Sequence, residues 1–277
     1  MKKLSINLPT AMLATVLSMS LTSCETLSYQ VYEVKSPDLI QRENSLVFEN
    51  EDCKVSYNLW EYNGSMAFIF ENKSEKDIFI DMSQTFFIKN GAAFDYYKDR
   101  TFESRSYGDV ASGNFASNEY ISSEGYWPNR YLIRVANNTK LGISSAVTTK
   151  EAEYVCIPAK SYKVINAFKI YPSFIKTCNE TIDYPQKMTI VGEYEENSSP
   201  LKFKNRIAYS FEENNNSLKF IDNSFWLSSV KNYSQKEAIE TKKEKDECRS
   251  SSSYTAYKKY RYFKIGGPNQ FYVNLGR

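Results

Sequence analysis

Histidine is absent from the 277 residues of this chain. Its absence excludes a Ser-His-Asp triad, a Cys-His nucleophile pair and any metal site that uses imidazole. No two cysteines have a Cys-x-x-Cys spacing, so the sequence predicts neither a zinc ribbon nor a thioredoxin-like redox centre. We therefore expect no metal and no cofactor, and any catalysis would have to depend on carboxylates.

The chain also lacks an excess of charge of either sign once its first residues are set aside. Lys and Arg together number 35 against 33 Asp and Glu, and Lys2 and Lys3 account for the difference. A balanced chain lacks the long-range field that draws proteins to nucleic acid or to anionic lipid. We expect no nucleic-acid partner, and attachment to a membrane would have to come from lipid.

Residues 1–23 have the pattern of a secretory signal peptide. Lys2 and Lys3 precede a mostly apolar stretch over residues 4–21, which Pro9 and several serines interrupt. A permanent transmembrane helix needs about 20 predominantly apolar residues, so a cleaved signal is the better interpretation.

The signal ends in Leu21-Thr22-Ser23-Cys24. This motif resembles the lipobox of bacterial lipoproteins, with Leu three positions before the cysteine and small residues between them. The resemblance implies cleavage before Cys24 and acylation, for example by palmitate, of its sulfur and then of its new amino group. Each buried CH₂ contributes about 0.8 kcal/mol, so two or three acyl chains would hold the domain on a membrane almost permanently. The alternative is an ordinary secreted protein with a coincidental cysteine.

Residues 24–44 are polar and include Pro37. We expect them to form a tether that lifts the domain off the bilayer, with only a weak strand pattern at Gln30–Val34.

From residue 45 onward the sequence is typical of short β-strands. Apolar residues alternate with polar ones over residues 53–59 and 66–70, on either side of Asn63-Gly64, and a second Asn-Gly pair follows at 90–91. Asn-Gly predicts a hairpin because both residues tolerate positive φ. Further short runs that are aromatic or β-branched lie at 78–80, 85–88, 92–97, 154–157, 162–170, 187–191, 203–211, 218–221, 224–230 and 271–275.

About ten strands without βα alternation predict an antiparallel, immunoglobulin-like β-sandwich over residues 45–277. Residues 99–150, rich in Ser, Asn and Gly, are expected to be a long irregular insertion that packs partly back onto the sheet. Two domains divided at this segment are the alternative. Residues 235–247 are predicted to form one short surface helix, polar almost all round.

Tyr- and Asn-rich strands such as residues 68–74 and 86–91, following a lipobox, resemble those of uncharacterised Bacteroides-type envelope lipoproteins. This resemblance implies a location in the bacterial cell envelope, with the outer membrane favoured over the inner, and supplies no catalytic residue. Residues 25–28 lack the acidic run that resembles a surface-export signal in those bacteria, so periplasmic and surface orientations both stay open.

Three aromatic residues are candidate ligand contacts: Trp60, beside the first Asn-Gly pair, and Tyr126 and Trp127 in the insertion. β-Sandwich modules bind glycans by laying sugar rings on aromatic faces at loop tips. Core packing is the other interpretation of both tryptophans, because Trp is highly buried on average.

Residues 257–264 interleave basic and aromatic side chains, a composition that in an exported protein suits a sugar polymer or an anionic lipid headgroup better than nucleic acid. The mixed charges of residues 242–247 are typical of a solvated face. Cys53, Cys156, Cys178 and Cys248 could form two disulfides or remain free thiols, and the sequence leaves both alternatives open.

These observations together predict a lipid-anchored envelope protein that binds or scaffolds another envelope protein or a glycan without catalysis. A carboxylate-dependent glycan hydrolase is the alternative, because glycosidases need only two acidic side chains. No acidic pair stands out, and Asp77 and Asp81 fit turns and strand ends better than an active site.

Overall fold

The computed structural model describes residues 27–99, 101–105, 115–121, 130–136, 146–166, 168–213, 217–246 and 255–275. The protein is mostly β, as the sequence predicts, with antiparallel sheets and two short α-helices in these ranges. The signal segment, Cys24, Tyr126, Trp127 and Cys248 lie outside the described residues.

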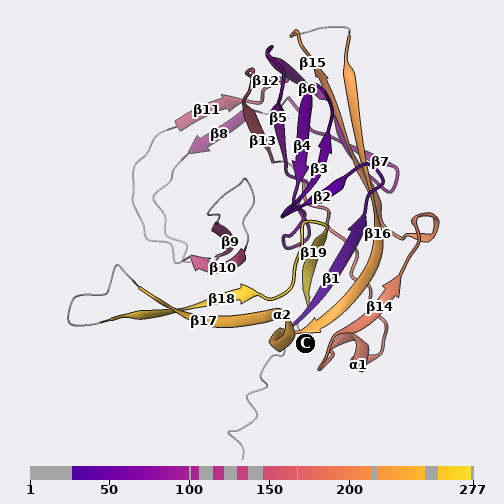
Figure 1. Ribbon diagram of the computed structural model, residues 1–277, viewed down its shortest axis with the longest axis vertical. Helices are drawn as coiled ribbons and strands as arrows, with labels where there is room; N and C mark the ends of the chain where they lie inside the picture. Colours follow the sequence, from indigo (N-terminus) through magenta and orange to yellow (C-terminus); the bar gives the residue numbers. More distant parts are fainter. Residues whose placement is uncertain are drawn as a thin grey trace, which may run out of the picture.

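Two large sheets form the body of the molecule (Figure 1). The eight-stranded sheet has the order β12-β6-β15-β16-β1-β19, with β7 paired to β6 and β14 paired to β16. Its strands are β1 (Ser28–Lys35), β6 (Ile78–Lys89), β7 (Ala92–Asp95), β12 (Tyr154–Ile157), β14 (Thr189–Glu193), β15 (Lys202–Ser210), β16 (Lys219–Ser234) and β19 (Gln270–Leu275). Strands from before and after residues 99–150 therefore share one sheet.

The five-stranded sheet has the order β13-β5-β4-β3-β2. Its strands are β2 (Ile40–Arg42), β3 (Ser45–Glu49), β4 (Cys53–Tyr57), β5 (Phe68–Asn72) and β13 (Tyr162–Ile165). The alternation in the sequence correctly predicts which side chains of β4 and β5 turn inward, since Val55, Phe68 and Phe70 are fully buried.

The main core lies between these two sheets, in a sandwich-like arrangement. Tyr57 of β4 meets Phe225 of β16 edge to face, with ring centroids 5.6 Å apart, and Phe225 stacks on Phe203 of β15 at 5.0 Å. These rings join the sheets because each sheet turns one apolar face toward the other.

The expected tether at 24–44 does not hold for residues 28–35. They form β1, which pairs with β16 on one side and with β19 on the other, and most of its residues are buried. The sequence pattern is weak because a central strand with both faces covered does not alternate, and because Gln30 is polar although fully buried.

The two Asn-Gly pairs differ in their role. Asn90 and Gly91 have φ of 47° and 85° and close a tight hairpin in which Lys89 pairs with Ala92, as predicted. Asn63 and Gly64 also have positive φ, but they lie within a longer connection at 58–67 between β4 and β5.

A smaller sheet extends to the side of the body (Figure 1). Its order is β17-β18-β10-β9, and its strands are β9 (Phe115–Ile121), β10 (Arg130–Ala136), β17 (Ile239–Lys245) and β18 (Tyr257–Phe263). β8 (Thr101–Arg105) pairs separately with β11 (Ala146–Lys150). The segment expected to be irregular thus contributes four strands, and it contacts the rest of the fold where Leu132 pairs with Tyr262.

The helix predicted over residues 235–247 is wrong beyond its first turn. α2 covers only Gln235–Ala238, and the chain continues as β17. Lys and Glu favour helices locally, but pairing with β18 overrides that preference. The other short helices are α1 (Glu180–Asp183) and the 3₁₀ turn Glu196–Ser198, and no helix in the described ranges is long and apolar enough to cross a membrane.

Candidate ligand-binding site

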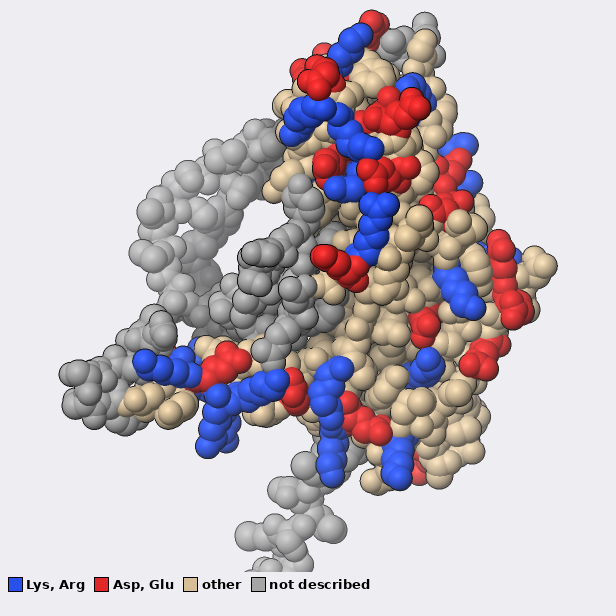
Figure 2. Space-filling view, in the orientation of Figure 1, with Lys and Arg blue, Asp and Glu red and all other residues tan. Residues whose placement is uncertain are grey.

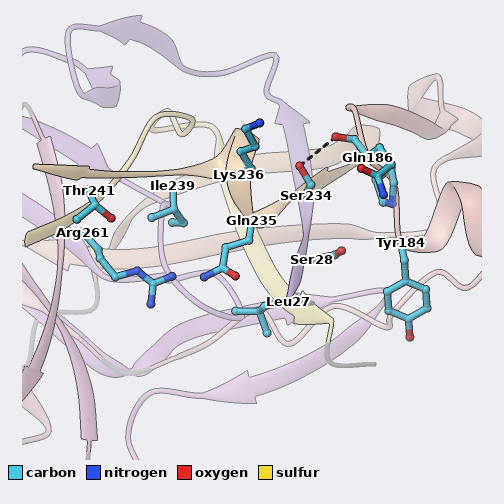
Figure 3. A pocket seen from close by; sticks show the side chains of 11 residues that line it. Leu27, Ser28, Tyr184, Gln186, Ser234, Gln235, Lys236, Ile239, Thr241 and Arg261 are labelled. Atoms are coloured by element: carbon cyan, nitrogen blue, oxygen red, sulfur yellow. Dashed lines mark hydrogen bonds between the residues drawn. The ribbon is translucent and has the colours of Figure 1, made fainter. Parts of the chain in front are cut away.

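A hollow of about 590 Å³ opens where β1, the end of β16 and the β17–β18 pair meet (Figure 3). Its walls consist of Leu27, Ser28, Tyr184, Pro185, Gln186, Ser234, Gln235, Lys236, Ile239, Thr241 and Arg261. We refer to this hollow as the basal pocket.

α2 forms one rim of the basal pocket because it redirects the chain from β16 into β17. The Ser234 hydroxyl accepts a hydrogen bond from the Glu237 amide at 3.4 Å, which caps the helix. The Lys264 amide donates to the Ala238 carbonyl at 2.8 Å, and the Lys264 ammonium donates to the Lys236 carbonyl at 2.6 Å. These bonds hold Gln235 and Lys236 at the edge of the hollow.

The opposite wall comes from the chain that follows α1. The Ser234 hydroxyl donates to the Gln186 carbonyl at 3.2 Å, as the dashed line in Figure 3 shows. Two residues earlier in β16, the side-chain amide of Asn232 donates to the Ile182 carbonyl at 2.8 Å. The end of β16 therefore supports both walls.

The lining of the basal pocket carries positive charge and amide groups. Among the described lining residues, Lys236 and Arg261 are charged, Gln186 and Gln235 add amides, and none is acidic. Figure 3 shows the Gln235 amide and the Arg261 guanidinium extending toward the same space. Burial raises the pKa of the Tyr29 hydroxyl, while the charge of the neighbouring Arg261 and its hydrogen bond act in the opposite direction.

This arrangement can donate hydrogen bonds to an oxygen-rich or anionic ligand. Ser28, Ser234 and Thr241 add hydroxyls to the lining, and none of the described lining residues carries a carboxylate.

Two further hollows lie on the described surface, and one of them adjoins the basal pocket, with which it shares Tyr184, Pro185 and Gln186. One, of about 240 Å³, is lined by the half-buried Trp226 with one acidic residue, Glu196, and the other, of about 540 Å³, follows α1 and contains Glu180. None of the three hollows is lined by two carboxylates. Within the described ranges, no group of three Cys, Asp or Glu residues is placed to hold a metal ion.

Trp60 lies in the core rather than in any of these hollows. Its side chain is 1% exposed and packs edge to face on Phe263 and tilted on Tyr272, with centroids 5.2 and 5.1 Å away. A ring so enclosed presents no face to a sugar, so its burial supports the core interpretation. The other two candidates, Tyr126 and Trp127, fall outside the described residues, as does the lipidation candidate Cys24.

The two acidic residues assigned to turns bind backbone amides. Asp77 accepts from the Ala159 amide at 3.0 Å, and Asp81 accepts from the amides of Ser83 and Gln84 at 2.9 and 3.1 Å. These bonds fix local structure.

Three of the cysteines are free thiols: Cys53, Cys156 and Cys178. Burial raises the pKa of Cys53 to about 12, and the neighbouring Asp52 charge adds to the shift. A thiol in this state is a poor nucleophile, because the thiolate is the reactive form.

Sequence reasoning identified only one part of the basal pocket. Arg261 lies in the basic and aromatic run at 257–264, whereas the other lining residues come from three separate parts of the chain, at 27–28, 184–186 and 234–241. No local pattern marks Gln186 or Gln235, since only the pairing of β16, β17 and β18 brings them together.

Comparison of the chain with protein-family models, with curated proteins and with solved structures finds no match.

Proposed function

We propose that this protein is a lipoprotein held in the bacterial cell envelope by acyl chains on Cys24, and that its β domain acts by binding an envelope component without catalysis. The observation that carries the proposal is the position of Leu27. This residue lies only three positions after the lipobox cysteine and forms part of the wall of the basal pocket.

The short distance along the chain limits where the domain can lie. Three extended residues span about 10 Å at most. Because β1 begins at Ser28, an acylated Cys24 keeps the basal pocket close to the headgroups of the membrane, with no long tether between them. This geometry favours a ligand that is itself part of, or attached to, the envelope.

The lining of the pocket narrows the chemistry of the ligand. Arg261, Gln186 and Gln235 supply N–H donors, which suit hydroxyl, carboxylate or phosphate oxygens. An envelope glycan offers such groups in high density. Another envelope protein remains the alternative partner, to be distinguished by experiment.

The anchor is tested by fractionating cells that make the full chain or its Cys24→Ser variant. We expect the unmodified chain to stay with membranes after a salt wash and to leave them only in detergent, because acyl chains rather than charges hold it. The Cys24→Ser variant should lack the lipid that mass spectrometry detects on the N-terminal peptide of the unmodified chain. Cys178→Ser, which changes an exposed cysteine elsewhere, is the matched control and should behave as the unmodified chain. An N-terminal peptide without lipid in the unmodified chain would contradict the proposal.

The binding role is tested with soluble fragments of envelope glycans and the chain from residue 24 onward. Gln235→Ala should weaken binding about fivefold, because a hydrogen bond contributes on the order of 1 kcal/mol. Gln41→Ala, on the exposed edge strand β2, is the control and should leave affinity unchanged. Equal affinity in both variants, or release of cleaved glycan products, would overturn the proposed role.

A further inference from the structure

The paired strands β17 and β18 form a ribbon with two different faces. They are antiparallel throughout, from Ile239 opposite Phe263 to Lys245 opposite Tyr257. Side chains of directly opposed residues point to the same face, and successive pairs alternate between the faces. Figure 1 shows the ribbon extending sideways from the end of the molecule at which β1 begins.

One face carries cations without any carboxylate. Its opposed pairs beyond the buried base are Thr241 with Arg261, Lys243 with Lys259, and Lys245 with Tyr257. All six side chains are exposed, and we call this set the cationic face. Basic side chains project from this part of the molecule in Figure 2.

The other face has its charges compensated. Lys242 forms an ion pair with Glu240 at 2.8 Å, and the Tyr262 hydroxyl donates to Glu244 at 2.5 Å. Lys258, directly opposite Glu244, lies over the Tyr260 ring at 5.7 Å. Among the described residues of the ribbon, the positive charge without a paired carboxylate therefore lies on one side.

Gathering the cations on one face destabilises the ribbon in the isolated protein. Lys243 lies directly opposite Lys259, and like charges in such a pair are destabilising. An anionic partner on the cationic face would relieve the repulsion. The arrangement thus favours a partner with negative charge spread over a surface at least as long as the ribbon.

We infer that the cationic face rests on the anionic phospholipid surface of the membrane that holds Cys24, and so sets the orientation of the domain; the inference rests on the proposed function. Arg261 and Thr241 share the basal pocket with Leu27, which places the base of the ribbon within reach of the bilayer. Tyr257, 67% exposed, ends the face with an aromatic ring of the type enriched at membrane interfaces. Acyl chains alone hold the domain but leave it free to rotate.

Vesicle binding of the chain from residue 24 onward, with Cys24→Ser, tests this inference. That chain keeps every described residue and removes the acyl chains, which would hide a weaker contact. We expect binding to vesicles of equal parts phosphatidylcholine and phosphatidylglycerol, and none to phosphatidylcholine alone. Each basic side chain near an anionic surface contributes about fivefold to partitioning, so Lys243→Gln with Lys259→Gln should lower it about 25-fold. Binding should also weaken as salt is raised.

The matched control is Lys242→Gln with Lys258→Gln, which removes the same charge from the compensated face. It should retain most of the binding. A 25-fold loss in both variants would mean that net charge alone draws the protein to the vesicles, and no loss in the first would mean that the face makes no contact. Either result overturns the inference.

A second measurement needs no variant. Acetylation of vesicle-bound protein, mapped by mass spectrometry, should leave Lys243 and Lys259 protected and Lys242 and Lys258 modified. Equal modification of all four lysines would contradict a membrane surface as the partner. So would a soluble oligonucleotide that protects the same two lysines and binds the protein more tightly than the vesicles do. Because these measurements use a chain without lipid, their failure leaves the acylation of Cys24 untouched, and the reverse also holds.

Discussion

The side chain of Gln30 forms hydrogen bonds with the main chain of Ile175 in both directions. Its amide nitrogen donates to the Ile175 carbonyl at 2.9 Å, and its carbonyl accepts from the Ile175 amide at 3.1 Å. Gln30 is fully buried in β1, whereas Ile175 belongs to a segment without helix or strand. The Gln30 side chain thus bonds the main chain of Ile175 in the way that a neighbouring strand would. Its amide nitrogen also donates to the side-chain oxygen of Asn232 in β16 at 2.9 Å.

The change Gln30→Leu should lower the free energy of unfolding by about 2–4 kcal/mol. It removes both hydrogen bonds from Gln30 to the main chain of Ile175 and the bond to Asn232, and each buried polar group left unsatisfied costs about 1–3 kcal/mol. Urea denaturation measures the change. Gln41→Leu, at an exposed position of β2, is the control and should differ from the unmodified chain by less than about 0.5 kcal/mol. Similar stability of the two variants would show that the bonds to Ile175 do not hold that segment.

A second buried network joins the two large sheets through Tyr57. Its hydroxyl donates to Asn223 of β16 at 2.9 Å and accepts from Asn205 of β15 at 3.2 Å, and Asn205 in turn accepts from the Tyr96 hydroxyl at 2.9 Å. We expect Tyr57→Phe to destabilise the fold by about 1–3 kcal/mol, because it removes the Tyr57 hydroxyl and with it the hydrogen bonds to the buried side chains of Asn223 and Asn205. Thermal or urea unfolding provides the measurement. Tyr257→Phe, on an exposed ring, should change stability little, and an equal effect of both changes would count against the network.

The β class and several strands could be predicted from the sequence because their causes are local. Alternation identifies the inward side chains of β4, and Asn90-Gly91 specifies its own turn. β1 was mistaken for a tether because a central strand that contains Ser28 and Gln30 shows no period of two, and its partners β16 and β19 lie about 200 residues or more away. Pairing at such distances is invisible to local patterns.

β17 illustrates the same limit at the candidate site. Taken alone, the sequence of residues 242–247 indicates a solvated run of mixed charges. The sequence of residues 257–264 indicates a separate run of basic and aromatic side chains. Only the register that places Lys243 opposite Lys259, and Glu244 opposite Lys258, shows that one face is compensated and the other is not. A formal charge balance over the whole chain therefore says little about the field at one surface, because screening confines each charge to about 10 Å.

The loop between β18 and β19 provides a test of the packing around Trp60. A Cβ atom added at Gly266 would lie 2.6 Å from the Trp60 ring, and Gly266 has φ of +125°. Gly266→Ala should therefore cost about 2–4 kcal/mol, the sum of backbone strain and overpacking. Gly91, with φ of +85° but no atom within 4 Å of such a Cβ, is the matched control, and Gly91→Ala should cost only about 1 kcal/mol.

Urea unfolding followed by tryptophan fluorescence measures both effects. A shifted emission maximum in the folded Gly266→Ala variant would report a displaced Trp60 ring, whereas Gly91→Ala should leave the spectrum unchanged. If both variants lost the same stability, the close approach of Gly266 to Trp60 would be contradicted.

Stability should fall in alkaline solution, partly because of Cys53. Burial raises the pKa of this thiol from 9.0 to about 12, so the folded state keeps the proton over a range in which the unfolded state releases it. The contribution is fully present below about pH 9 and is lost as the pH rises toward 12, at about 1.4 kcal/mol per pH unit. Burial also raises the pKa values of Tyr57 and Tyr96, which act in the same direction at higher pH.

Measuring the free energy of unfolding across this range, for the unmodified chain and for Cys53→Ala, isolates the thiol. The variant lacks the titrating group, so its stability should fall less steeply between about pH 9 and 12. Cys178→Ala removes an exposed thiol and should retain the steeper fall of the unmodified chain. Parallel curves for the unmodified chain and Cys53→Ala would mean that Cys53 gains no protection from burial, in contradiction to its position at the inner face of β4.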